Sequence, residues 1–394
     1  MKKTGKIVVL AIIFLLSLTL SMACKNKNKT SESVGGSNSV SATESISESG
    51  SENKYSEGLE YELNSDGNSY TVVGIGSFNG TELNIPEEYH GMPVTSIGVC
   101  AFEDCGELTS IIIPDSMTSI GLRAFKDCGG LSNITIPDSV ISIGVSAFEN
   151  CSDLMNIAIP DGVESVGDGA FYGCGGLTRI TIPKSVTSLG EGVFADCAGL
   201  ESITVVKGNI KYVDKDNCLI EIGTSTLIVG CKKSVIQNDG SVTSIGNSAF
   251  EYCSGLTSVT IPDSVTSIGV SAFEACSGLT SVTIGNGVTS VGDRAFLWCD
   301  WLTNITIPDS VVSMGDSAFS QCRGLTSVKI PDSVISIREW VFFGCGELTS
   351  IEFEGTTTQW KSISKGANWN YDTGNYTIHC TDGDIKSHNV IIII

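Results

Sequence analysis

Ile261 to Thr283 reads IPDSVTSIGVSAFEACSGLTSVT, and this 23-residue stretch recurs with small changes along most of the chain. Each copy carries a Phe that is followed three residues later by a Cys. The Phe positions are Phe102, Phe125, Phe148, Phe171, Phe194, Phe250, Phe273, Phe296, Phe319 and Phe342. A fixed period of this length predicts a solenoid, in which each repeat forms one coil and contacts only its neighbours.

The end of each copy predicts a short strand with one buried side. Val282 and Ile284 alternate with Ser281 and Thr283, so the two aliphatic residues face the core. Pro and then Asp follow in most copies and suit the end of a strand and a tight turn. We expect a right-handed solenoid with a parallel β-sheet on one face, mostly β and loop with little helix. The inward Phe and Cys ladder includes Phe125, Cys128, Phe148, Cys151, Phe273, Cys276, Phe296 and Cys299.

The pattern LxxIxIPxSVxxIGxxAFxxC extends from about Leu83 to Phe353 and resembles the BspA-like leucine-rich repeat family. Members of that family are mostly surface proteins of anaerobic bacteria and some protozoa, and they are associated with adhesion to host matrix proteins or to other cells. The resemblance therefore implies a leucine-rich-repeat solenoid. It also implies a non-catalytic, protein-binding module on a bacterial surface, with a periplasmic or envelope scaffold without host ligand as the alternative.

The first residues predict export. Residues 1–23 combine an early cluster of Lys with a short apolar run, which is typical of a signal peptide. Cys24 follows Ser-Met-Ala and predicts a lipid anchor at the outer membrane or cell surface; plain cleavage after Ala23 stays open. The spacing to the preceding Leu is one that spirochaetal lipoproteins tolerate. Residues 24–57 are rich in Ser and poor in apolar residues, so we expect a disordered tether.

The remainder divides into a cap, the solenoid and a second cap. We predict an N-terminal β-hairpin cap over 58–82, a solenoid over 83–355 and a C-terminal cap over 356–394. We expect the C-terminal cap to begin with a short helix that has Thr357 or Thr358 as its N-cap residue.

An insertion at about 206–238 interrupts the repeat. Two apolar segments flank a turn, which predicts a protruding hairpin that pairs Ile220 with Val229 and Cys218 with Cys231. A disulfide between these two cysteines stays open. The ladder cysteines, in contrast, are expected to remain free thiols, because parallel stacking points their Cβ bonds the same way.

Composition and motifs argue against several functions. A net charge of −21 disfavours nucleic acid and anionic lipid, so we expect membrane association only through the lipid anchor. No metal, cofactor or catalytic set is expected, since none of the three His lies within metal-ligand spacing of a Cys pair and the recurring Asp follows Pro in turns. Asp214 to Asn217 resembles part of a calcium loop, but turn chemistry explains it more simply.

The predicted partner is a protein from the host extracellular matrix or another cell surface, and two features could bind it. The outward strand face offers small polar side chains, namely Ser258, Thr260, Ser281, Thr283, Asn304 and Thr306. Trp298 and Trp301 depart from the repeat at outward positions, and exposed aromatics often anchor partners. Trp340 and Phe343 also depart from it, but their place in the last coil favours packing on Trp360 and Trp369 of the C-terminal cap.

Overall fold

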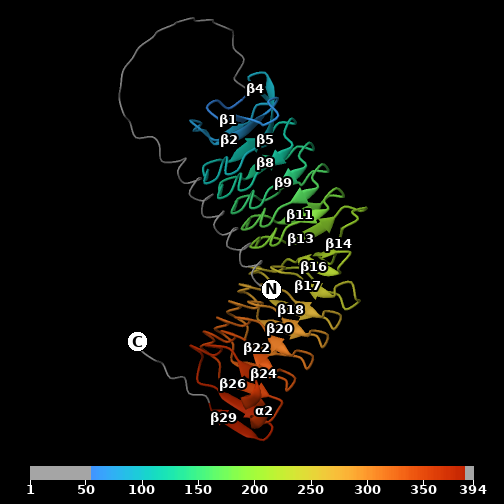
Figure 1. The fold of residues 1–394 in the computed structure, drawn as a ribbon, viewed down its shortest axis with the longest axis vertical. Helices are drawn as coiled ribbons and strands as arrows, with labels where there is room; N and C mark the ends of the chain where they lie inside the picture. Colours follow the sequence, from blue (N-terminus) through green and yellow to red (C-terminus); the bar gives the residue numbers. More distant parts are fainter. Residues whose placement is uncertain (1–54, 387–394) are drawn as a thin grey trace, which may run out of the picture. The chain divides into compact units, whose positions relative to one another are not determined.

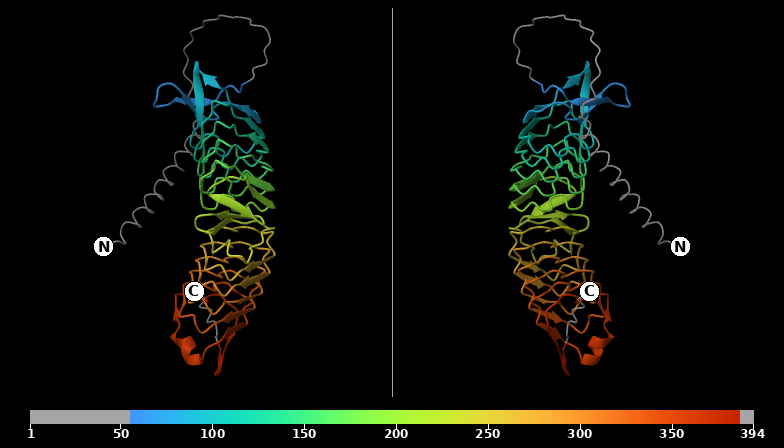
Figure 2. Two further views of the ribbon diagram at one scale, coloured as in Figure 1. Left: turned by 90° about the vertical axis from the view of Figure 1, so that its right-hand side faces the viewer. Right: turned by 90° about the vertical axis from the view of Figure 1, so that its left-hand side faces the viewer.

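The computed structural model describes residues 55–386, so the predicted signal peptide, Cys24, almost all of the predicted tether and the final residues lie outside it. Residues 55–386 form a β-solenoid of about 13 turns of roughly 23 residues each, with parallel strands and almost no helix. Figure 1 shows the coils following one another in chain order, and Figure 2 shows them from the two flanking sides. The predicted fold class is confirmed.

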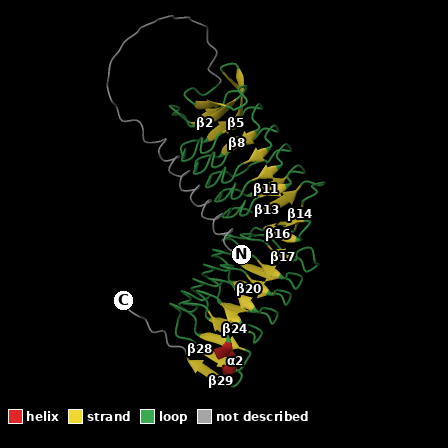
Figure 3. Ribbon diagram, in the orientation of Figure 1, coloured by secondary structure: helices red, strands yellow, loops and turns green. Residues whose placement is uncertain are grey.

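Figure 3 shows the strands following one another along the solenoid, with turns and loops on either side of them. The first ladder consists of the strands in which buried aliphatic residues alternate with exposed ones. We call the surface formed by the exposed side chains of these strands the outer strand face. Its members are β3 (Glu82–Asn84), β6 (Ser110–Ile112), β8 (Asn133–Thr135), β11 (Arg179–Ile182), β13 (Ser202–Val205), β18 (Ser258–Ile261), β20 (Ser281–Ile284), β22 (Asn304–Thr306), β24 (Ser327–Ile330), β26 (Ser350–Phe353), β28 (Thr377–Cys380) and β29 (Gly383–Lys386).

A second ladder follows the turn after each strand. Most of its strands have only two residues, a Ser and a buried aliphatic residue. Its members are β1 (Glu60–Leu63), β2 (Tyr70–Gly74), β4 (Glu88–Tyr89), β5 (Met92–Ile97), β7 (Ser119–Ile120), β9 (Ser142–Ile143), β10 (Ser165–Val166), β12 (Ser188–Leu189), β14 (Tyr212–Lys215), β15 (Cys218–Glu221), β16 (Thr226–Val229), β17 (Ser244–Ile245), β19 (Ser267–Ile268), β21 (Ser290–Val291), β23 (Ser313–Met314), β25 (Ser336–Ile337) and β27 (Ser364–Lys365).

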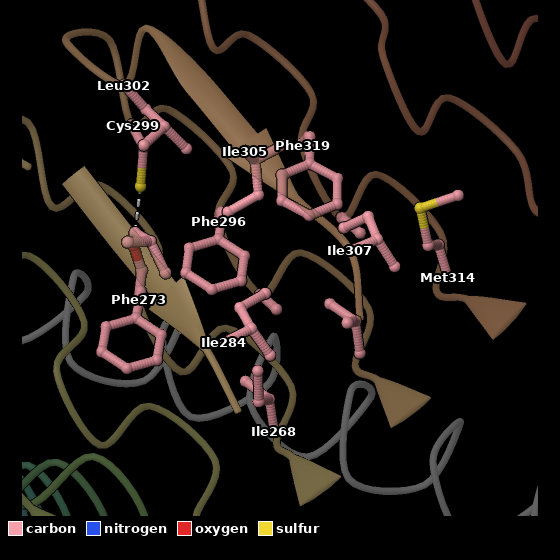
Figure 4. Close-up of a cluster of buried hydrophobic side chains, with 14 of the residues drawn as sticks. Ile268, Phe273, Ile284, Phe296, Cys299, Leu302, Ile305, Ile307, Met314 and Phe319 are labelled. Carbon is pink, nitrogen blue, oxygen red and sulfur yellow. Dashed lines mark hydrogen bonds between the residues drawn. The ribbon is translucent and has the colours of Figure 1, made fainter. Parts of the chain in front are cut away.

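The core is built from copies of one side chain packed on the next. The Phe rings stack in two runs, Phe102 to Phe194 and Phe250 to Phe342, and neighbouring ring planes differ by no more than 14°. Figure 4 shows Phe273, Phe296 and Phe319 in one such row, with aliphatic side chains of the strands beside them. Each ring is removed from water by its own copies, which is why no coil can be stable alone.

β15 and β16 form the predicted antiparallel hairpin, but this hairpin does not protrude from the solenoid, so that part of the prediction was wrong. β14 pairs with β15 and β15 with β16 in antiparallel fashion, while β16 pairs in parallel with β17. The insertion therefore extends the second ladder. Leu219 lies opposite Val229 and Ile220 opposite Leu227, with a bulge between them, so the expected register is also wrong.

The register differs because both faces of β15 are buried. Leu219 packs in the core of the preceding coils, whereas Cys218 and Ile220 pack in the core of the following coils. The inserted strands thus separate two hydrophobic clusters. The coils remain joined on the Phe side, where the Asp196 N–H donates to the Glu251 carbonyl at 3.1 Å.

Additional strands pair with both ends of the repeat. β1 and β2 form an antiparallel pair, and β2 continues in parallel to β5 of the first coil. At the other end the helix α2 (Thr357–Ser362) precedes β27, and its cap is Thr356 rather than the expected Thr357 or Thr358. The Thr356 side chain accepts from the Gln359 N–H, and the Gln359 side chain accepts from the Thr356 N–H.

Candidate protein-binding surface

The outer strand face presents the predicted small polar side chains to solvent. Ser258, Thr260, Ser281, Thr283, Asn304 and Thr306 are all exposed. β18 and β20 pair in register, so Ser258 lies beside Ser281 and Thr260 beside Thr283. The hydrogen-bonded ladder then stops and restarts at β22, so Asn304 and Thr306 belong to the next sheet along the chain.

The hydroxyls of this face differ in their hydrogen bonding from those of the Thr residues that directly precede the strands. The Thr280 hydroxyl donates to the Thr257 carbonyl at 3.0 Å, and the Thr326 hydroxyl donates to the Thr303 carbonyl at 2.9 Å. Those Thr residues tie adjacent coils together. The Thr260 and Thr283 hydroxyls form no hydrogen bond within residues 55–386, so they are accessible to water or a ligand.

Trp298 and Trp301 are the two Trp side chains most exposed in the described part of the chain, at 41% and 67%. Trp298 has a φ of 60°, a left-handed conformation that most other coils give to Asp, Asn or Gly at this place, although Tyr252, Ala275 and Gln321 also adopt it. Its backbone N–H donates to the Ser320 carbonyl at 3.0 Å, so the turn itself is regular. The coil therefore accepts a bulky residue in a backbone conformation unfavourable to it.

Trp301 occupies a position that most other coils give to Gly. A Cβ at Gly324, one coil later, would lie 2.7 Å from the Asp300 carbonyl oxygen. Most copies avoid a side chain here because the preceding coil is close. Polar side chains occupy neighbouring turn positions: Arg323 Nε lies 3.9 Å from Asp300 Oδ1, and Arg323 donates to the Gln321 side chain at 3.3 Å.

The other irregular aromatic residues pack on the C-terminal cap, but on a different partner from the one expected. Trp340 and Phe343 form an edge contact at 5.0 Å, and Phe343 stacks on Tyr371 at 5.9 Å. The expected partners, Trp360 and Trp369, instead contact Phe353 and Phe342 respectively. These rings therefore cover the last coil, which leaves Trp298 and Trp301 as the exposed pair.

The ladder cysteines are free thiols, and all but Cys105 and Cys253 are buried. In the eight buried ones Sγ donates to the carbonyl of the Phe one coil earlier, for example from Cys299 to Phe273 at 3.2 Å, which is the dashed line in Figure 4. Burial raises the pKa of these thiols, and that of Cys345 rises to about 12. They are therefore poor nucleophiles. The repeat pattern predicted that these thiols point inward and stay free, but it did not predict their hydrogen bonds.

The inserted cysteines and acidic residues also have structural roles. Cys218 and Cys231 are both free, so the possible disulfide is not formed. The Asp214 carboxylate accepts from the Val205 N–H at 2.7 Å, and the side-chain amide oxygen Oδ1 of Asn217 accepts from the Ile203 N–H at 3.4 Å. These side chains pair with backbone groups at the edge of β13. No three His, Cys, Asp or Glu side chains within residues 55–386 are placed to share a metal ion.

Comparison with known proteins identifies the family. The model of the BspA type leucine rich repeat region matches residues 95–220 and 243–367. The chain belongs to this family. The gap between the two matched ranges overlaps the insertion, where the repeat is interrupted.

Solved structures of bacterial leucine-rich repeat proteins and of a pneumococcal antigen share the fold. A leucine rich cell surface protein from Faecalibacterium prausnitzii is 29% identical, with a TM-score of 0.60, over 78% of this chain and 96% of that one. The pneumococcal vaccine antigen PcpA is 19% identical with a TM-score of 0.62, over 83% and 98%. A leucine-rich repeat protein from Eubacterium ventriosum is 21% identical with a TM-score of 0.51, over 86% and 96%. No curated protein matches.

The described part of this BspA-type chain also contains no helix with the length and apolar character needed to cross a bilayer.

Proposed function

We propose that this BspA-type protein is a non-catalytic module that binds a protein partner at a bacterial surface. The partner belongs to the host extracellular matrix or to another cell. The observation that carries the proposal is the exposed pair Trp298 and Trp301. Both occupy turn positions that the repeat normally gives to smaller residues, so their rings are not needed to build the coil.

Large exposed rings fit partner binding because they can bury much apolar area while losing little conformational freedom. The polar side chains around them, Asp300, Gln321 and Arg323, would form a rim that fixes orientation. The accessible hydroxyls of the outer strand face are the second candidate surface. We place the solenoid outside the cell on a lipid anchor at Cys24, with residues 25–57 as the spacer.

The test replaces both Trp298 and Trp301 by Ser and measures binding of the folded protein to immobilised extracellular-matrix proteins. We expect a loss of at least tenfold in affinity with an unchanged unfolding temperature. Met155→Ser is the matched control, because Met155 is 60% exposed and lies in the N-terminal half of the solenoid. Full binding by the double variant would discard this patch and transfer the proposal to the outer strand face.

Exposure to protease on intact cells separates the surface module from an envelope scaffold. A surface protein is removed by added protease, whereas a periplasmic scaffold is protected until the outer membrane is permeabilised. Protection on intact cells would contradict the proposed display.

A further inference from the structure

The outer strand face changes character at its C-terminal end. Along one row of this face, β18, β20 and β22 carry Thr260, Thr283 and Thr306. The same row then continues with charged or ionisable side chains, which lie at registered positions on four adjacent strands. These side chains are Lys329 on β24, Glu352 on β26, His379 on β28 and Asp384 on β29.

A shallow pocket of about 500 Å³ opens over this part of the row. Its lining is formed by Lys329, Ser350, Glu352, Phe353, Glu354, His379, Cys380 and Thr381. The pocket thus combines ionisable groups with hydroxyls and with the half-buried thiol of Cys380, whereas the Phe353 ring is buried against Trp360. A long side chain with a charged end suits such a lining, because its methylene groups can lie beside the thiol while its charge meets the ionisable groups.

The pairing of charges leaves one carboxylate without a partner. Lys329 lies beside Glu352 in register, but its Nζ is 2.6 Å from Oε1 of Glu354. On the other side, Nδ1 of His379 is 2.9 Å from Oδ1 of Asp384. Within residues 55–386 the Glu352 carboxylate accepts no hydrogen bond and forms no ion pair. The pocket therefore has an excess of negative charge.

We propose that this pocket binds an arginine or lysine side chain of the partner protein, with Glu352 as the carboxylate that receives it. The inference rests on the proposed function as a protein-binding module and specifies one chemical feature of the partner. The Ser350 and Thr381 hydroxyls can accept further N–H groups of a guanidinium. The chain's net charge of −21 favours approach of a basic partner, and added salt weakens that attraction.

The direct test uses the full chain and two pentapeptides, acetyl-Gly-Ser-Arg-Ser-Gly-amide and the same peptide with citrulline in place of arginine. Citrulline has nearly the same shape but no charge. Titration calorimetry should show about three- to tenfold weaker binding of the citrulline peptide, as expected for one partly exposed charge pair. Equal binding of the two peptides would overturn the proposal.

Three variants locate the charge. E352Q should weaken binding of the arginine peptide by about three- to tenfold, whereas E82Q should leave it unchanged, since Glu82 is an exposed carboxylate on β3 at the other end of the outer strand face. K329M should strengthen binding by about threefold, because it leaves Glu354 unpaired as well. If E352Q bound the arginine peptide as tightly as the parent protein, at an unchanged unfolding temperature, the assignment of Glu352 as the receiving carboxylate would be wrong.

The outcomes also separate this inference from the proposed function. If the arginine peptide does not bind but the full chain still adheres to matrix proteins through Trp298 and Trp301, only the pocket assignment fails. If the full chain adheres to no protein surface, the proposed function fails, whatever the peptides do.

Discussion

Replacing Phe273 by Ala tests how the stack of rings stabilises the solenoid. Phe273 is fully buried, and its ring lies between those of Phe250 at 5.0 Å and Phe296 at 5.1 Å. A buried Phe→Ala change costs about 3–5 kcal/mol, and loss of the stacking contacts favours the upper part of that range. The coils around the cavity should lose stability first, since each coil depends on its neighbours.

Phe148→Ala is the matched control in the other hydrophobic cluster. Phe148 is equally buried and lies between Phe125 at 5.2 Å and Phe171 at 5.3 Å. All five Trp residues lie at position 298 or later, so Trp fluorescence reports on the coils after the insertion. Far-UV circular dichroism reports on the whole solenoid.

The two variants should therefore give different signals during urea unfolding. Phe273→Ala should lower the midpoint seen by Trp fluorescence, while Phe148→Ala should lower the midpoint of part of the circular dichroism change and leave the fluorescence midpoint near that of the parent. An equal shift of both signals in both variants would show that the inserted strands do not divide the solenoid into separately cooperative parts. An unchanged free energy of unfolding for Phe273→Ala would refute its place in the core.

Other predictions address the insertion, the thiols and the anchor. Gly230→Ala should destabilise by about 1–3 kcal/mol, because its Cβ would lie 2.0 Å from the Phe250 ring, whereas Gly223→Ala has no atom within 4 Å of its Cβ and should change the unfolding temperature little. Burial raises the pKa of the ladder thiols in the folded state, so with rising pH the thiols of the unfolded chain lose their protons first. The free energy of unfolding should therefore fall as pH rises above about 9. Urea unfolding midpoints measured at pH 7 and pH 10 check this, and equal midpoints would contradict it. Cys24→Ala should move the protein from the membrane to the soluble fraction, and unchanged partition with no lipid mass on the N-terminal peptide would favour plain cleavage after Ala23.

The regular coils could be predicted from the sequence because each coil packs against near-copies of itself. Val282 and Ile284 are buried against equivalent residues of the adjacent coils, so the pattern of one repeat determines which side chains turn inward. The same logic correctly places Trp298 and Trp301 outside. Which positions of a regular coil are exposed can therefore be predicted from the repeat alone.

The insertion and the C-terminal pocket could not be predicted in this way, because their neighbours are not copies of themselves. The hairpin prediction assumed that one face of β15 meets water, but Leu219 and Ile220 enter different cores. Likewise the pocket depends on how β28 and β29 continue the outer strand face beyond the last repeat. Neither pairing is visible in the 23-residue pattern.

A repetitive surface has a consequence for specificity. If a partner contacted only the Thr row of the outer strand face, a shift by one coil would offer it nearly the same contacts, and its position would be weakly determined. A defined complex needs positions at which coils differ. Trp298 and Trp301 break the pattern on the turn side, and Lys329 and Glu352 break it on the strand side. All four lie in the coils after the insertion, so a partner that is held in one position should bind the C-terminal half of the solenoid.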